Sequence, residues 1–168
     1  GAKIIYTKIQ RDFDELGSDQ IADFTQKLVS RTIDLSQKYG EDVSFVVCRY
    51  LCLSIAAIAL QVNREGVVNQ ILTWFNPILQ SAPRVMLELL YLLPEECDNY
   101  QIDVDRDTRD MFAYQLTESF NDVASFLQSL MEAPGCTDFT KIKILNCLAA
   151  WIECTFVAGS QVAVHPTF

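Results

Sequence analysis

Apolar residues recur along almost the whole chain with the spacing of one face of an α-helix. Near the N-terminus, for example, Ile5, Ile9, Phe13 and Leu16 follow one another at helical intervals. Glycine, proline and acidic segments separate such stretches, and no segment alternates apolar and polar residues as a half-buried strand does. The pattern therefore predicts an all-α fold of about seven helices.

The breaks between apolar stretches set the limits of the expected helices. Gly17 is expected to end the first helix in a left-handed conformation, and Gly40 to end the second. Pro94 is expected to close the fifth, and the acidic segment 95–105, which lacks a helical period, to form a loop. The expected helices cover residues 1–16, 19–39, 42–61, 65–79, 83–93, 106–132 and 138–156.

Amphipathic helices alternate with more fully apolar ones, which is the pattern of stacked helical pairs. The first helices of the pairs begin near residues 19, 65 and 106. Spacings of roughly 45 and 41 residues lie in the range of HEAT or armadillo repeats and above that of tetratricopeptides. We therefore expect an α-α superhelix, a single HEAT-like segment over residues 1–168. The unpaired first helix and the last eight residues, which resemble the opening of another element, suggest a piece of a longer solenoid.

The last expected helix carries apolar residues on two sides. A helix of this kind is expected to be sandwiched between layers. The two stripes are Ile142, Leu145, Ala149, Ile152 and Phe156, and Ile144, Leu148 and Trp151.

The most apolar segment runs from Val43 to Leu60 and just reaches the length of a membrane span. Arg49 lies in its first half, where a charge is costly in lipid, and Ser44 and Ser54 reduce its hydrophobicity further. We expect a helix buried by its neighbours and no membrane insertion.

Composition narrows the classes of partner. Half of the 168 residues are hydrophobic, which excludes a disordered chain and allows a substantial core. The chain has 13 basic and 22 acidic residues, a net charge of −9. Direct binding of nucleic acid is not expected, because phosphate contacts need clustered lysine and arginine. A basic protein partner suits this charge.

The cysteines do not form a metal-binding pattern. No two are spaced as C-x-x-C, and His165 is the only histidine, so a zinc site is not expected. We interpret Cys48 and Cys52 as small buried hydrophobic residues in a reducing compartment. His165 precedes a proline in the C-terminal tail and is expected to be solvated, not paired with a catalytic cysteine.

An acidic run at the start of the sixth helix has part of the spacing of a calcium loop. Asp103, Asp105 and Asp107 match the first three ligands of an EF-hand. Thr108 and Tyr114 occupy positions where that loop needs glycine and glutamate, so we exclude it. The chain also lacks a glycine-rich phosphate loop and a nucleophile elbow. We predict no metal, no cofactor and no enzyme activity.

Three segments are similar to a known family. Lys8–Leu16 resembles the K-I-Q-x-x-F-x-E-L helix end of transportin-SR and its importin relatives, and Leu87–Glu96 resembles their L-L-x-x-L-P-E-E segment. Asn146–Trp151 is similar to their C-L/F-x-S-W segment, with Ala150 in place of the serine. Order and separations also agree over essentially the whole chain. The sequence resembles the N-terminal region of importin-β superfamily receptors (exportin-1 and importin-β types), nearest the transportin-SR and importin-thirteen branch.

The resemblance implies a function by protein–protein contact. Such receptors are HEAT-repeat superhelices that shuttle between nucleus and cytoplasm and carry cargo through nuclear pores. RanGTP binds the inner face of their N-terminal repeats, and in import receptors it releases the cargo. RanGTP, protein cargo and nuclear pore proteins are therefore the implied partners, with neither the cargo nor the direction of transport specified.

Acidic residues on the second helix of each pair are the candidate contacts. If these helices line the concave side, their charges attract basic partners and raise the rate of encounter. The candidates are Glu88, Glu95, Glu96, Asp98 and Glu153.

Two other classes of protein fit the length. A stand-alone helical adaptor of the ENTH or VHS type, acting in trafficking, would need a self-contained domain with capped ends, and the unpaired first helix argues against it. An all-helical enzyme would need polar groups converging in its core, whereas the predicted core is almost wholly apolar.

Overall fold

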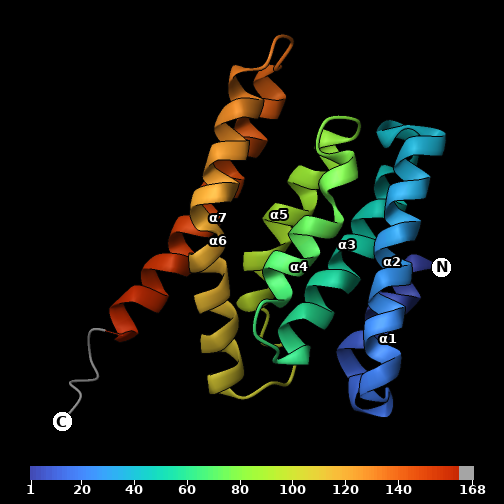
Figure 1. Cartoon of the computed structure of the whole chain (residues 1–168), viewed down its shortest axis with the longest axis vertical. Helices are drawn as coiled ribbons and strands as arrows, with labels where there is room; N and C mark the ends of the chain where they lie inside the picture. Colours follow the sequence, from blue (N-terminus) through green and yellow to red (C-terminus); the bar gives the residue numbers. More distant parts are fainter. Residues whose placement is uncertain (163–168) are drawn as a thin grey trace.

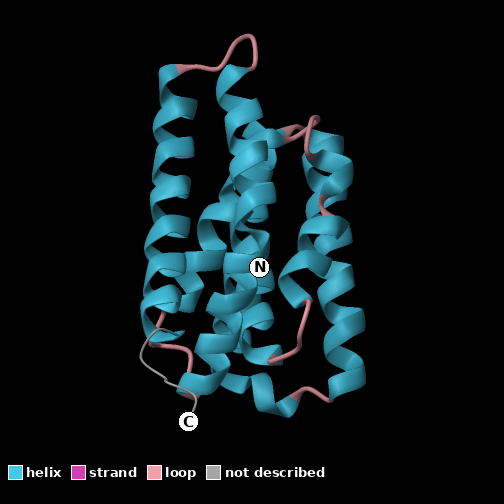
Figure 2. Cartoon of the chain, turned by 60° about the vertical axis from the view of Figure 1, so that its left-hand side comes forward, coloured by secondary structure: helices cyan, strands magenta, loops and turns pink. Residues whose placement is uncertain are grey.

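The computed structural model describes the backbone of residues 1–162 and the side chains of residues 1–156. This part of the chain is helical throughout and contains no strand (Figure 2). The helices are α1 (Ala2–Asp12), α2 (Ser18–Tyr39), α3 (Glu41–Val62), α4 (Val67–Trp74), α5 (Pro83–Cys97), α6 (Arg106–Glu132) and α7 (Asp138–Val162), with short 3-10 helices η1 (Phe13–Glu15) and η2 (Asn76–Ile78).

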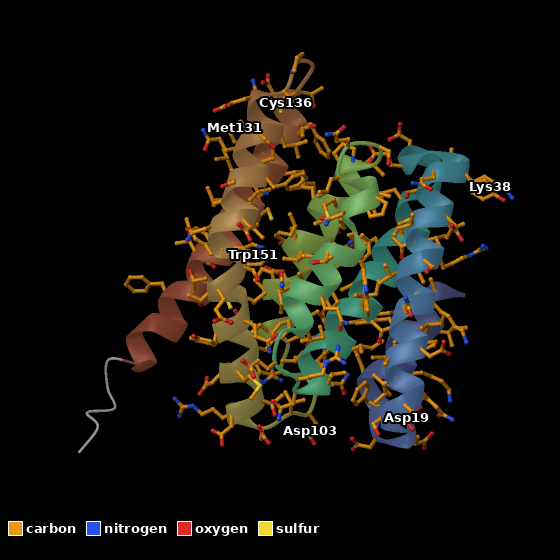
Figure 3. The ribbon with its side chains drawn as sticks, in the orientation of Figure 1. Asp19, Lys38, Asp103, Met131, Cys136 and Trp151 are labelled. Carbon is orange, nitrogen blue, oxygen red and sulfur yellow. The ribbon has the colours of Figure 1, made fainter. Side chains whose placement is uncertain are left out.

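The helices pack in two layers (Figure 1). One layer, here called the odd-numbered layer, contains α1, α3, α5 and α7, each packed against the next. The even-numbered layer contains α2, α4 and α6, and α2 and α6 pair with α3 and α7. Asp19 and Lys38 lie at opposite ends of α2, and Asp103 and Met131 at opposite ends of the α6 region (Figure 3). The repeated pairing confirms the predicted α-α superhelix.

The centre of the core is α3, which lies between α1, α2 and α5. Cys48, Cys52 and Ile55 are fully buried there. The hydroxyls of Ser44 and Ser54 donate to the helix backbone one turn earlier, so neither is an unpaired buried group. By length and composition α3 could also cross a membrane, and its burial among three helices accounts for this hydrophobicity.

Two helix ends differ from the expected ones for local reasons. Gly17 is extended, with φ of −67°, and not left-handed, because η1 already ends the first helix. Gly40, with φ of +75°, does separate α2 from α3 in a conformation that favours glycine. The expected helix over 65–79 is divided into α4 and η2, since Pro77 cannot continue the α-helical hydrogen bonds.

The prediction that Pro94 ends the fifth helix is wrong. Helix α5 continues to Cys97 with Pro94 inside it. A proline at this position leaves the carbonyl of Leu90 without its helical donor. The indole Nε1–H of Trp151, on α7, donates to that carbonyl at 2.7 Å. The loop is therefore shorter than the expected segment 95–105.

The prediction that α7 is covered on both sides is also wrong for the part of the chain described here. Ile144 and Trp151 are buried against the rest of the core, and Leu148 is half-buried. The other stripe faces outward: Ile142 is 57% exposed and Phe156 is 78% exposed. The helix also continues beyond the expected residue 156, to Val162.

Candidate protein-binding surface

The five predicted acidic contacts fall into two groups. Glu95, Asp98 and Glu153 are exposed, whereas Glu88 and Glu96 are buried. All five belong to α5, the residue after it, or α7, so the structure does gather them in the odd-numbered layer. Contact with a partner stays a prediction for each of them.

Glu88 forms an ion pair between neighbouring helices. The Nε–H of Arg49, on α3, donates to the Oε1 of Glu88, on α5, at 2.6 Å. The Arg49 side chain keeps 48% of its surface exposed, and solvent screens such a pair. The pair therefore contributes chiefly to the fit of α3 against α5.

Glu96 is the acceptor in a polar network between α1 and α5. The hydroxyl of Tyr6 donates to the two carboxylate oxygens at 3.0 and 3.2 Å, and the Nδ2 of Asn99 donates to both as well. Gln10 in turn donates to the Tyr6 hydroxyl at 2.8 Å. Burial raises the pKa of Glu96, and burial together with the charge of Glu96 raises the pKa of Tyr6. Glu96 thus has internal partners that hold α1 against the end of α5.

The C-terminal turn of α5 carries negative charge where a helix favours positive charge. Glu95 and Glu96 lie in it, Asp98 is the C-cap, and the turn has no basic residue. Helix stability therefore does not account for the acidic residues at this end.

Arg109, from α6, supplies the missing positive charge. Its guanidinium donates to the backbone carbonyls of Cys97 at 2.6 Å, Asn99 at 3.1 Å and Ile102 at 2.5 Å. It also lies 4.8 Å from the centre of the Tyr100 ring. These contacts fix the loop after α5 and so the position of Asp98. Sequence reasoning missed Arg109, because nothing in its local pattern distinguishes it from a solvated charge.

Glu95, Asp98 and Glu153 together form what we call the acidic edge. Helices α5 and α7 are neighbours, and a hydrogen bond between the thiols of Cys97 and Cys154 joins them beside Asp98 and Glu153. Among the residues that the structure describes, none of the three acidic residues forms an ion pair. Their charges are available to a basic partner.

A groove of about 600 Å³ opens at the other end of α5. Apolar side chains from four helices line it, together with two ion pairs, Arg49–Glu88 and Arg84–Asp42. The Arg84 guanidinium lies 4.0 Å from the Phe45 ring centre. The apolar lining consists of Phe45, Leu87, Tyr91, Leu130 and Phe139. The sequence gave no signal for this groove, since its walls are far apart in the chain.

Candidate catalytic and metal-binding groups do not converge in the described residues. Within this range, no three histidine, cysteine, aspartate or glutamate side chains are grouped to hold a metal. All six cysteines are free thiols, and Cys48 and Cys52 are buried as predicted. His165 lies outside the described residues.

Comparison with known proteins identifies the family. The model of the Exportin 1-like protein family matches residues 45–167, well over half of the chain. Transportin MOS14 from Arabidopsis thaliana is 27% identical over 172 residues, covering 98% of this chain. Importin-13 from Bos taurus and from Homo sapiens are each 23% identical over 161 residues, covering 91% of it. The chain spans only 16 to 17% of the length of these relatives. It belongs to the Exportin 1-like family, in the transportin-like branch of the importin-β superfamily.

Proposed function

We propose that this chain is part of a nuclear transport receptor and binds RanGTP through the acidic edge. The family membership supports the class of protein, and the exposed, unpaired charges of Glu95, Asp98 and Glu153 are the observation that carries the site. They lie on the odd-numbered layer, which contains the second helix of each pair. Glu88 and Glu96 support this surface from within, through Arg49 and Tyr6.

The receptor acts by protein–protein contact and not by catalysis. Its proposed partners are RanGTP, protein cargo and nuclear pore proteins, and it shuttles between the nucleus and the cytoplasm. Family membership supports this over the stand-alone adaptor and over an enzyme.

We also propose that the chain is a segment of a longer solenoid. The relatives are about six times its length, and the exposed stripe of α7 from Ile142 to Phe156 is the side on which another helical pair would pack. A following pair would bury this apolar stripe, as α5 buries the opposite side of α7.

Charge reversal on the acidic edge tests the proposed binding. In the intact natural chain, the triple change Glu95→Lys, Asp98→Lys and Glu153→Lys should weaken RanGTP binding about tenfold or more at low salt, and less at high salt. Affinity measured by titration at two salt concentrations gives both numbers. Asp122→Lys, at an exposed position on α6, is the matched control and should leave affinity unchanged. Equal affinity of the triple variant and the natural chain would remove the acidic edge from the interface.

A further inference from the structure

Two cysteines from neighbouring helices lie together in the core. Cys97 is the last residue of α5, Cys154 lies on α7, and only 5% and 6% of their surfaces are exposed. The Cys97 thiol donates a hydrogen bond to the sulfur of Cys154. The two sulfurs are therefore direct neighbours although the residues are far apart in the chain.

The backbone on both sides of the pair is fixed. One turn before Cys154, the indole of Trp151 donates to the carbonyl of Leu90 on α5 at 2.7 Å, which sets the register of α7 against α5. Figure 3 labels Trp151 where α7 faces α5. At the other partner, the guanidinium of Arg109 holds the carbonyl of Cys97 at 2.6 Å. The pair is thus held together by its surroundings and not by a transient approach of two loops.

The other cysteines differ in what they could join. Cys48 and Cys52 are one turn apart on α3, so a bond between them would constrain nothing beyond that turn. Cys147 is buried on α7, and Cys136 lies in the turn before α7 and is partly exposed. Among the described residues, the Cys97–Cys154 pair is the one placed to connect two helices covalently.

We propose that Cys97 and Cys154 are a reversible disulfide site that forms when the protein meets a small peroxide. The Cys154 thiolate attacks one peroxide oxygen, the O–O bond breaks, and hydroxide leaves, so that Cys154 becomes a sulfenic acid. The Cys97 sulfur then attacks the Cys154 sulfur. The Cys97 proton and the sulfenic hydroxyl leave as water. The two thiols are oxidised by two electrons, the peroxide is reduced to two waters, and a dithiol reductant reverses the reaction.

The roles of the two sulfurs follow from their environment. The hydrogen bond from Cys97 stabilises the thiolate of Cys154 and lowers its pKa. The same bond, together with burial, raises the pKa of Cys97. Cys154 is therefore the attacking residue and Cys97 the resolving one. The bond would join α5 to α7 and limit the movement of one helical pair against the next.

Peptide mapping of the intact natural chain tests the site directly. The protein is treated with hydrogen peroxide, its free thiols are alkylated with iodoacetamide, and it is digested without reduction for mass spectrometry. We expect a cross-linked peptide that contains Cys97 and Cys154 and disappears after treatment with dithiothreitol. Recovery of both residues as alkylated peptides, or of Cys154 as a sulfinic acid beside a free Cys97, would overturn the proposal.

Two serine variants separate the pair from general thiol oxidation. Cys154→Ser should lose the cross-link and leave Cys97 alkylated. Cys147→Ser, the same substitution at a buried position of the same helix, should retain it. Oxidation should also raise the melting temperature of the natural chain and of Cys147→Ser but not that of Cys154→Ser. A rise of equal size in all three would assign the effect to another thiol. If Cys154→Ser does not fold, the digest of the natural chain still decides the question.

Discussion

At the scale of single residues, one side chain lets a proline lie inside a helix. Pro94 removes the donor for the carbonyl of Leu90, and Trp151 replaces that donor from another helix. A buried carbonyl without a donor costs free energy. The proline and the tryptophan are therefore coupled energetically, although 57 positions separate them in the sequence.

A double-mutant cycle should reveal this coupling. Trp151→Phe should lower the free energy of unfolding by about 1–3 kcal/mol, because the Leu90 carbonyl loses its donor. In a Pro94→Ala background the same change should cost less, by about 1 kcal/mol, since the alanine N–H can serve that carbonyl. Urea denaturation of the four proteins measures both values. Trp74→Phe, at a half-buried tryptophan, controls for loss of the indole. Equal costs of Trp151→Phe in the two backgrounds would contradict the coupling.

At the scale of the element, the ends of helices are set by side chains within them and beyond them. Helix α6 begins where the sequence predicts, because the Oδ1 of Asp105 accepts the backbone N–H of Thr108 at 2.7 Å. The end of α5 depends instead on Arg109, a residue of the next helix. The first signal is local and visible in the sequence, and the second is not.

The cap of α6 should depend on pH. The backbone hydrogen bond from Thr108 lowers the pKa of Asp105. A lowered pKa means that the cap stabilises the helix above the ordinary aspartate pKa and is lost as the pH falls through the lowered value. At neutral pH, Asp105→Ala should speed hydrogen exchange at the amides of the first turn of α6. This difference from the natural chain should disappear in acid.

Asp103→Ala is the matched control for the cap, because Asp103 lies two residues earlier in the loop and caps no helix. It should leave exchange in α6 unchanged at any pH. A difference between Asp105→Ala and the natural chain that persists unchanged in strong acid would show that the charge of the cap is not responsible.

At the scale of the whole molecule, the layers are tied by contacts that skip a helix. The network of Tyr6 and Glu96 connects α1 to α5 past the central helix α3. The Nε2 of Gln61, near the end of α3, donates to the carbonyl of Ile9 at 3.1 Å. These bonds fix the same end of three successive helices of the odd-numbered layer. The arrangement of the pairs therefore depends on a few buried polar groups as well as on apolar packing.

Removal of the Tyr6 hydroxyl should loosen this end of the layer. Tyr6→Phe keeps the ring but leaves the buried Glu96 carboxylate with fewer donors. Burial raises the pKa of Glu96, so its carboxyl is tolerated best when protonated, and a raised pKa opposes stability as the pH rises through it. Faster hydrogen exchange is therefore expected in α1 and at the end of α5, more at neutral than at acid pH. Thr7→Val, at the next residue, whose hydroxyl donates only within α1, is the control. Uniformly unchanged exchange in Tyr6→Phe would contradict the role of the network.

Residue patterns alone predict the helical class, most of the boundaries and the pairing of helices. The apolar period, the break at residues 133–135 and the cap at Asp105 act through neighbours in the chain, so they can be recognised there. The resemblance of three short segments likewise points to the family that the comparisons identify. These signals are local, and local signals do not require knowledge of the packing.

Only the tertiary structure decided which acidic residues are free. Glu95 and Glu96 are adjacent and chemically alike, yet one is exposed and the other accepts the hydroxyl of Tyr6 from a helix about 90 residues away. The continuation of α5 through Pro94 and the pairing of Cys97 with Cys154 arise in the same way. Each depends on a side chain from a distant segment, and the position of that side chain is set by the packing of whole helices, which no local pattern encodes.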